Sequence, residues 1–264
     1  MISTTKSNRL FKKALVYILS LFFFSTHLFA QRAMYHAGNR KILTSANGTS
    51  AGNVSITDGL VLNLDAGNST SYSGTGTTWT DLSGNGNHGT LINSPTYNSS
   101  DGGNFLFNGS NTYVNVPLTK TASCTFSVWA KSSTPHSNNM LFNAGNDGRG
   151  PDLFFSSGVL SWNTWDSSGN PFGNIPATTT NGIWHHYVLV NDAVSNTAKL
   201  YYDGALYGSA IYRNASATTS LYIGGNTNTY MWNGAIATFS VYNKSLIASE
   251  VLQNYNSQKG RYGL

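Results

Sequence analysis

The fold is decided by Trp184-His-His-Tyr-Val-Leu-Val-Asn191, together with Ala198-Lys-Leu-Tyr-Tyr202 and the pair Asp203-Gly204 that follows it. In the first segment, bulky and β-branched residues occupy both phases of the strand alternation, which is typical of a strand covered on both faces. Asp203-Gly204 favours a type I′ hairpin turn, so another strand should follow. This part of the sequence predicts an antiparallel meander that begins with an interior strand.

The composition of the 264-residue chain is that of a β protein. Only 9% of the residues are charged, whereas 27 Gly, 15 Tyr, 13 Phe and 6 Trp are present. Such a composition is typical of many short strands joined by polar turns, and this length fits one large all-β domain. The single expected helix is Ser245–Gln253, with Ser245 as its cap. Cys124, the only cysteine, has the strand phase of Phe126 and Val128, which predicts a buried thiol.

The positive charge is concentrated at the amino terminus. Four of the 15 basic residues lie within the first thirty residues, which contain no acid, so the rest of the chain is nearly neutral. A nucleic-acid-binding domain would carry its basic residues on the folded part. We therefore expect no nucleic-acid partner.

Residues 1–30 have the organisation of a secretory signal. A basic start precedes the apolar run Ala14–Phe24, and Ser25-Thr-His-Leu-Phe-Ala30 follows it. We expect cleavage after Ala30 and a secreted protein. The alternative is an uncleaved segment that anchors the chain to a membrane, because Leu28 stands where a small residue is preferred.

Two further regions follow the signal. Residues 31–57 are polar and rich in small residues, which predicts a flexible lead-in. Residues 58–264 contain all of the predicted strands and the helix, so we expect one domain there. Its first strand should contain Leu60, Leu62 and Leu64, which alternate with other residues.

Three blocks in this region resemble laminin-G-like, concanavalin A-like domains of bacteria and phages. The residues that carry the resemblance are Asp81-x-Ser-Gly-Asn-Gly-Asn-His-Gly89 with Phe107, Gly109, Tyr113 and Val114 in the first block; Trp184, His186, Lys199, Leu200, Tyr201, Asp203 and Gly204 in the second; and Asn233-Gly-x-Ile236 with the helix near Glu250 in the third. The resemblance implies an all-β, two-sheet antiparallel jelly-roll sandwich of about 12 to 14 strands with one short C-terminal helix.

An enzymatic function is the third of the classes that we consider. Glycoside hydrolysis requires two carboxyl groups on either side of the scissile bond. Glu250 is the only glutamate, and it falls on the expected helix. His185 and His186 are adjacent in a strand, so their side chains should point to opposite faces and cannot serve one site. We expect neither a hydrolase nor a lyase.

Binding of an extracellular polysaccharide or glycoprotein is the function that we favour. Sugar rings stack on aromatic faces, while amide, carboxylate and guanidinium groups form hydrogen bonds with the sugar hydroxyls. The candidate residues in predicted loops and strand ends are Trp162, Asn163, Trp165, Arg149, Tyr230 and Trp232. In the alternative interpretation these aromatic residues seal the ends of the sandwich, and the domain is structural or adhesive and contacts another protein.

A weak calcium site is the last expectation from the sequence. Oxygen-bearing side chains recur at every second position in Asp81, Ser83, Asn85 and Asn87, and the intervening glycines permit a tight curl. Asp65 could supply a second carboxylate. In the alternative interpretation the same side chains form Asx-turns with the backbone of the loop.

Overall fold

The computed structural model describes residues 54–264 except residues 134–138, 146–149, 157–158, 165–171, 177–181, 213–218 and 226–229. The chain divides into two units, Met1–Ala51 and Gly52–Leu264, and the fold described below is that of the second. The predicted signal, residues 1–30, and most of the predicted lead-in lie outside the described residues.

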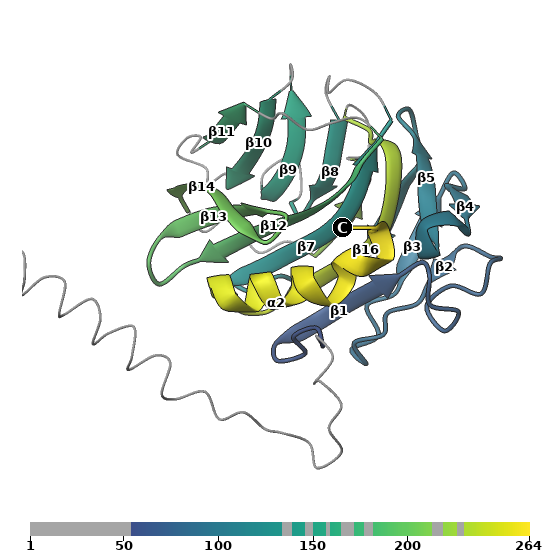
Figure 1. Cartoon of the computed structure of the whole chain (residues 1–264), viewed down its shortest axis with the longest axis horizontal. Coiled ribbons are helices and arrows are strands. Elements are labelled where there is room, and N and C mark those ends of the chain that lie inside the picture. Colours follow the sequence, from purple (N-terminus) through teal and green to yellow (C-terminus); the bar gives the residue numbers. More distant parts are fainter. Residues whose placement is uncertain are drawn as a thin grey trace, which may run out of the picture. The chain divides into compact units, whose positions relative to one another are not determined.

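Two antiparallel sheets of eight strands each form the domain (Figure 1). Sheet A has the order β14 (Ala205–Ile211), β13 (Thr197–Tyr202), β12 (Trp184–Asp192), β7 (Cys124–Ser132), β16 (Asn233–Tyr242), β5 (Asn104–Asn108) and β4 (Thr96–Asn98), and β1 (Leu60–Asp65) pairs with the second half of β16. Sheet B has the order β11 (Phe172–Pro176), β10 (Val159–Thr164), β9 (Pro151–Ser156), β8 (Asn139–Asn143), β15 (Leu221–Ile223), β6 (Tyr113–Val116), β3 (Gly89–Ile92) and β2 (Thr78–Trp79). The helical elements are η1 (Ser100–Gly102), α2 (Ala248–Gln258) and η2 (Lys259–Tyr262).

The expectation for the central meander is confirmed. Strand β12 is interior, because β7 pairs with it on one side and β13 on the other. Asp203 and Gly204 have φ angles of 48° and 79°, and Tyr202 pairs with Ala205 across them. Positive φ at both central residues is what a type I′ turn requires.

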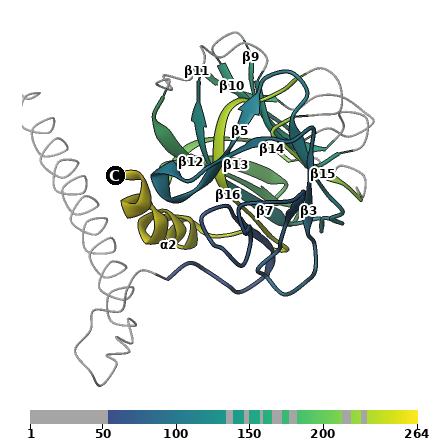
Figure 2. The same ribbon diagram turned by 90° about the vertical axis from the view of Figure 1, so that its right-hand side faces the viewer.

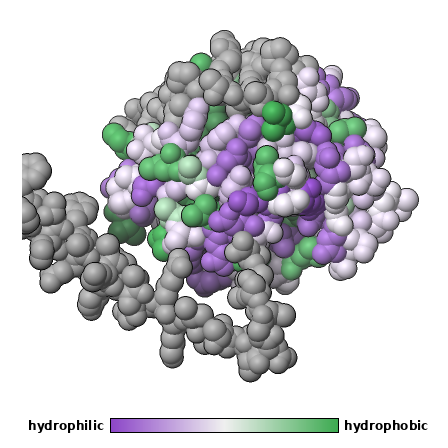
Figure 3. Space-filling model, viewed as in Figure 1, coloured by the Kyte–Doolittle hydropathy of each residue, from purple (hydrophilic) through white to green (hydrophobic). Residues whose placement is uncertain are grey.

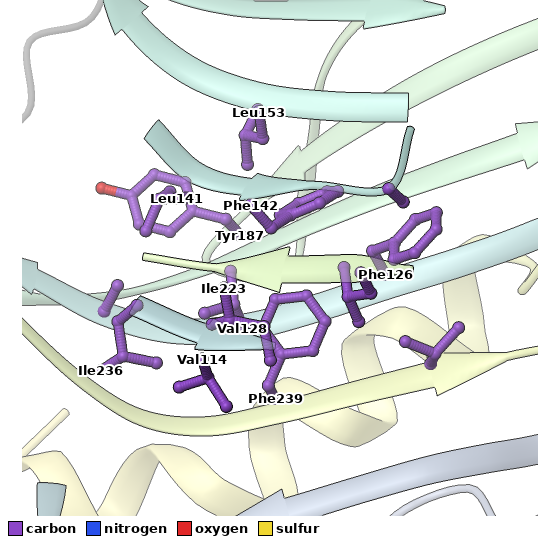
Figure 4. Packing of buried hydrophobic residues seen from close by; sticks show 14 of the residues in the cluster. Val114, Phe126, Val128, Leu141, Phe142, Leu153, Tyr187, Ile223, Ile236 and Phe239 are labelled. Carbon is purple, nitrogen blue, oxygen red and sulfur yellow. The ribbon is translucent and has the colours of Figure 1, made fainter. Parts of the chain in front are cut away.

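The core lies between the two sheets (Figure 4). Phe142 of sheet B packs against Phe126 and Phe239 of sheet A, with ring centroids 4.9 and 5.4 Å apart. All three rings are fully buried. Aromatic side chains bury more apolar area than any others, so this cluster contributes strongly to holding the sheets together.

The strand count exceeds the expected 12 to 14. Sixteen strands are present in the described residues, and the three that the sequence did not indicate are β2, β4 and β11. They contain two, three and five residues, too few for a hydrophobic period to appear. Pairing with a neighbour, rather than local sequence, makes each of them a strand.

The terminal helix begins three residues later than expected and continues farther, over Ala248–Gln258. Ser245 does not cap it, because the Ser245 hydroxyl donates a hydrogen bond to the carbonyl oxygen of Asn191 (2.8 Å). The N–H of Ile247 instead donates a hydrogen bond to the carboxylate of Glu250 (2.9 Å). An acidic side chain is favourable in the first turn of a helix.

Helix α2 and η2 cover part of the outer face of sheet A (Figure 2). The Trp129 ring stacks on His186 at 5.0 Å and on Tyr262 at 4.2 Å. Tyr255 of α2 is also parallel to Trp129, at 5.7 Å. No helix in the described part of the chain combines the length and the apolar character that crossing a membrane requires.

The compact unit begins at Gly52, whereas the sequence suggests a boundary at Asp58. Ile56 donates its N–H to the Asn254 side chain of α2 (2.7 Å), and its carbonyl oxygen accepts a hydrogen bond from the Tyr242 hydroxyl (3.1 Å). These partners are almost 200 positions away in the chain. Local sequence therefore gives no indication that the residues before Asp58 are ordered by the domain.

Truncation of Phe142 tests the importance of the core cluster. We expect Phe142→Ala to lower the free energy of unfolding by about 3–5 kcal/mol, because a buried aromatic ring is lost and a cavity remains. Leu206→Ala is the control, since Leu206 is 57% exposed, and it should change stability by less than about 0.5 kcal/mol. Chemical denaturation followed by circular dichroism measures both, and equal effects would contradict this account.

Candidate functional site

A row of side chains crosses the outer face of sheet B. Asn115 lies between the core residues Val114 and Val116, so its side chain points away from the core. The same alternation turns Tyr222 outward between the core residues Leu221 and Ile223. The outer face of this sheet thus carries the residues that the core does not use.

The register aligns these residues from strand to strand. Asp152 of β9 pairs with Asn143 of β8, Asn143 with Tyr222 of β15, Tyr222 with Asn115 of β6, and Asn115 with Thr90 of β3. We call these five residues the polar row. Neighbouring strands are about 4.8 Å apart, so the row is about 19 Å long. Tyr222, Asn115 and Thr90 are its half-buried or exposed members and can contact a ligand.

Asn163, a residue predicted from the sequence, stands at the next register position. Its backbone in β10 pairs with Asp152. Its side chain lies outside the described residues. The strand register therefore places the backbone of Asn163 at one end of the polar row, a row that the sequence did not indicate.

Asn143 and Asp152 of the row bond each other, whereas one oxygen of the row has no hydrogen-bonding partner in the described residues. The Asn143 amide lies 3.5 Å from a carboxylate oxygen of Asp152, and both residues are at most 2% exposed. The side-chain oxygen of Asn115 is buried and accepts no hydrogen bond. An unsatisfied buried acceptor is costly, so a hydroxyl donor from a ligand would stabilise this position.

Half-buried aromatic rings accompany the row. Tyr113 is two residues before Asn115 and therefore on the same face, and its ring centroid is 6.0 Å from that of Tyr222. Phe154 is two residues after Asp152, and its ring lies 6.3 Å from Tyr230. Tyr230, which the sequence predicted as a binding residue, thus contacts the residues of this face.

The prediction is wrong for the two tryptophans that the structure describes. Trp162 is 1% exposed and Trp232 is not exposed at all, so neither offers a ring face to a ligand. Trp162 has the strand phase of the core residue Leu160, and this signal could have predicted its burial. Trp232 packs in the same core, which agrees with the alternative that these rings seal the sandwich. Arg149 and Trp165 lie outside the described residues.

The carboxylate of Asp81 accepts hydrogen bonds from its own loop and from β1. One oxygen accepts the N–H groups of Asn63 (2.8 Å) and Ser83 (2.9 Å). The other accepts the Ser83 hydroxyl (2.8 Å) and the N–H of Asn87 (3.0 Å). Asp81 is 6% exposed. These bonds form the Asx-turn arrangement that the sequence left as the alternative to a calcium site.

The other expected calcium ligands are also engaged. The amide groups of Asn85 and Asn87 donate hydrogen bonds to the carbonyl oxygens of Leu60 (3.3 Å) and Val61 (2.8 Å). Asp65 forms an ion pair with Arg261 (2.7 Å). In the described residues no group of three or more His, Cys, Asp or Glu side chains could hold a metal ion. The calcium site stays a prediction from the sequence, and the Asp81 and Asp65 carboxylates have partners within the protein.

His185 and His186 point to opposite faces, as expected. His186 is fully buried, and its ring bonds the Ser127 hydroxyl (2.8 Å). Burial lowers the pKa of His186 to about 3 and so keeps the ring neutral. His185 instead pairs with Asp203 (2.8 Å). Burial also raises the pKa of the Cys124 thiol to about 11, as expected for a core cysteine.

Comparison with known proteins identifies the family. Residues 108–252 match the model of the concanavalin A-like lectin/glucanases superfamily, which is more than half of the chain. The chain belongs to this superfamily. The laminin-G-like resemblance of the sequence and the jelly-roll sandwich of the structure agree with this assignment. No curated protein matches the chain.

Solved structures with the same fold include botulinum neurotoxin binding domains and the binding domain of Paraclostridial Mosquitocidal Protein 1. The botulinum neurotoxin serotype D binding domain is 18% identical with a TM-score of 0.62, covering 77% of this chain and 53% of that one. The binding domain of Paraclostridial Mosquitocidal Protein 1 is 19% identical with a TM-score of 0.59, covering 76% and 52%. The binding domain of botulinum neurotoxin DC in complex with SialylT is 15% identical with a TM-score of 0.62, covering 77% and 52%. This chain spans about half of each, and identities this low show a shared fold only.

A calcium titration tests the interpretation of the Asp81 loop. We expect the melting temperature to be the same with about 10 mM calcium as with a chelator, because mass action stabilises only a protein that binds the ion. Asp81→Asn should lower stability by about 1–3 kcal/mol under both conditions, because it weakens buried hydrogen bonds. Asp58→Asn, at a side chain that is 84% exposed, is the control and should have little effect. A calcium-dependent rise that Asp81→Asn abolishes would restore the metal site.

Proposed function

We propose that the protein is an exported, non-catalytic recognition module that binds an extracellular polysaccharide or glycoprotein through the outer face of sheet B. The observation that carries the proposal is the polar row with its accompanying tyrosine and phenylalanine rings. The lectins in the superfamily's description are consistent with it.

The chemistry of this face suits a sugar chain. The amide group of Asn115, which is half-buried, both donates and accepts hydrogen bonds, as sugar hydroxyls do. The rings of Tyr113 and Tyr222 supply apolar surface for the C–H face of a sugar. The row runs across the strands, so a linear chain bound along it would meet Tyr222, Asn115 and Thr90 on three neighbouring strands.

A binding role is favoured over hydrolysis by the distribution of carboxyl groups. Asp152 is the only carboxylate among the five residues of the polar row. Glycosidases need a second carboxyl group across the scissile bond. Glu250 does not provide it, because it lies on α2 against sheet A and forms an ion pair with Lys244. Recognition requires no such pair.

Two further observations support an exported protein with a glycan or glycoprotein partner. The sequence of residues 1–30 has the pattern of an export signal, and these residues lie outside the described part of the chain. The similar solved structures include receptor-binding domains and one binding domain in complex with SialylT. The receptors and SialylT are partners of those proteins. For this chain they support only the class of partner, a glycan or glycoprotein.

A protein-binding, adhesive role is the second candidate, and strand β14 favours it. This strand is at the end of sheet A in the described residues, and Leu206 on it is 57% exposed. An exposed edge strand with apolar side chains can accept a strand from another protein.

A polysaccharide array tests the first candidate. We expect Tyr222→Ala and Asn115→Ala to weaken binding of the retained polysaccharide at least about tenfold, because a stacking surface and a central amide are lost. Asn111→Ala is the matched control for Asn115, since Asn111 is exposed outside the row, and it should bind normally.

Circular dichroism should show that all three variants remain folded. Unchanged binding by folded Tyr222→Ala and Asn115→Ala would contradict the assigned face. Failure of the wild-type protein to bind any glycan, together with loss of adhesion in Leu206→Asp, would favour the second candidate.

A further inference from the structure

A groove of about 460 Å³ lies on the other side of the molecule from the polar row. It is bounded by β1 and β16 of sheet A, by residues 55–57 and by α2 with η2. Hydrophilic residues predominate on the face that carries α2 (Figure 3). A pocket of this size can hold a small organic ligand.

The charges in the groove neutralise each other. Asp65 and Arg261 are its only charged lining residues, and they form an ion pair at 2.7 Å. The second terminal nitrogen of Arg261 donates hydrogen bonds to the carbonyl oxygens of Gly102 and Gly103, both at 2.7 Å. Since these groups satisfy each other, a charged ligand would gain little here. The groove favours a neutral ligand.

Most of the other lining residues carry neutral hydrogen-bonding groups. They include hydroxyl and amide side chains and one apolar wall, and the principal ones are Asn63, Thr238, Ser240, Ser257, Leu60 and Tyr242. A surface with alternating donors and acceptors next to an apolar wall complements a molecule that has several hydroxyl groups and a C–H face.

One buried acceptor in the groove has no partner. The side-chain oxygen of Gln258 is buried without a hydrogen bond, whereas its nitrogen donates to the Ser55 hydroxyl at 3.2 Å. The neighbouring Asn63 oxygen accepts only a long bond from the Ser240 hydroxyl, at 3.3 Å. Leaving a buried acceptor unpaired is costly, and a hydroxyl donor from a ligand would recover that cost.

From the volume, the neutral lining and the unpaired Gln258 oxygen, we infer that this groove binds one neutral sugar ring. It is a second binding site, independent of the polar row and formed by the opposite sheet. A protein with both sites holds two glycan segments at once, which raises its avidity for a branched or cross-linked polymer.

NMR titration of the ¹⁵N-labelled protein with glucose, galactose, mannose and N-acetylglucosamine tests the inference. A single ring in a groove should bind with a dissociation constant on the order of 1 mM. We expect saturable chemical-shift changes in the amides of Gln258, Ser240 and Asn63 with at least one of the four sugars. Absence of such changes with all four would overturn the inference.

Two variants on the same helix separate binding from general effects on α2. Gln258→Leu removes the unpaired acceptor and should weaken binding at least about tenfold. Gln253→Leu is the matched control, because Gln253 bonds the carbonyl oxygen of Val54 (2.7 Å) and does not line the groove. Ser240→Ala, on β16, is a second test if Gln258→Leu loosens the helix. Wild-type titration curves for both groove variants would overturn the inference.

The outcome for this groove is distinguishable from the outcome for the polar row. Tyr222→Ala should leave the shift changes at Gln258 and Ser240 intact, because Tyr222 is on the outer face of sheet B. Shift changes confined to Asn115 and Tyr222 would support the polar row and overturn the groove. Changes confined to the groove would do the reverse.

Discussion

The packing of Phe142 between Phe126 and Phe239 is the contact on which the sandwich depends. It joins the middle of sheet B to the middle of sheet A, and the inner strand phase of both sheets continues it outward as one core. Because the space between the sheets is filled by side chains, a ligand can bind only at the rims or on the outer faces. The alternation of each strand then leaves its second set of side chains free for other roles.

The outer faces of the two sheets differ in what covers them. On sheet A, the stack of Trp129 on Tyr262 and His186 holds the C-terminal segment against the strands. Arg261 fixes the end of that segment through Asp65 and two loop carbonyls, so part of this face becomes interior and a polar groove remains beside it. Sheet B has no comparable helix in the described residues, and its outward side chains line up across five strands as the polar row.

Sequence reasoning indicated only part of the face that carries the polar row. It selected Tyr230 and Asn163, which lie at the face of the polar row, because aromatic and amide residues near strand ends are common in glycan sites. It also selected Trp162 and Trp232, which are core residues, because it weighted the residue type above the strand phase. It missed Tyr222 and Asn115, whose outward position can be read locally but whose alignment cannot, since β15 and β6 are more than 100 residues apart.

The sequence by itself determined the fold class, the interior place of Trp184–Asn191, the hairpin at Asp203-Gly204 and the burial of Cys124, because alternation and turn propensities act over a few residues. Only the tertiary structure decided the register between distant strands and the short strands β2, β4 and β11. It decided as well that residues 54–57 are held in place by hydrogen bonds to α2. It also decided that Asp81 serves its own loop and Asp65 pairs with Arg261. Apart from the bonds of Asp81 to Ser83 and Asn87, these features depend on partners that lie farther along the chain, and no local pattern encodes which partner a hydrogen-bonding group will meet.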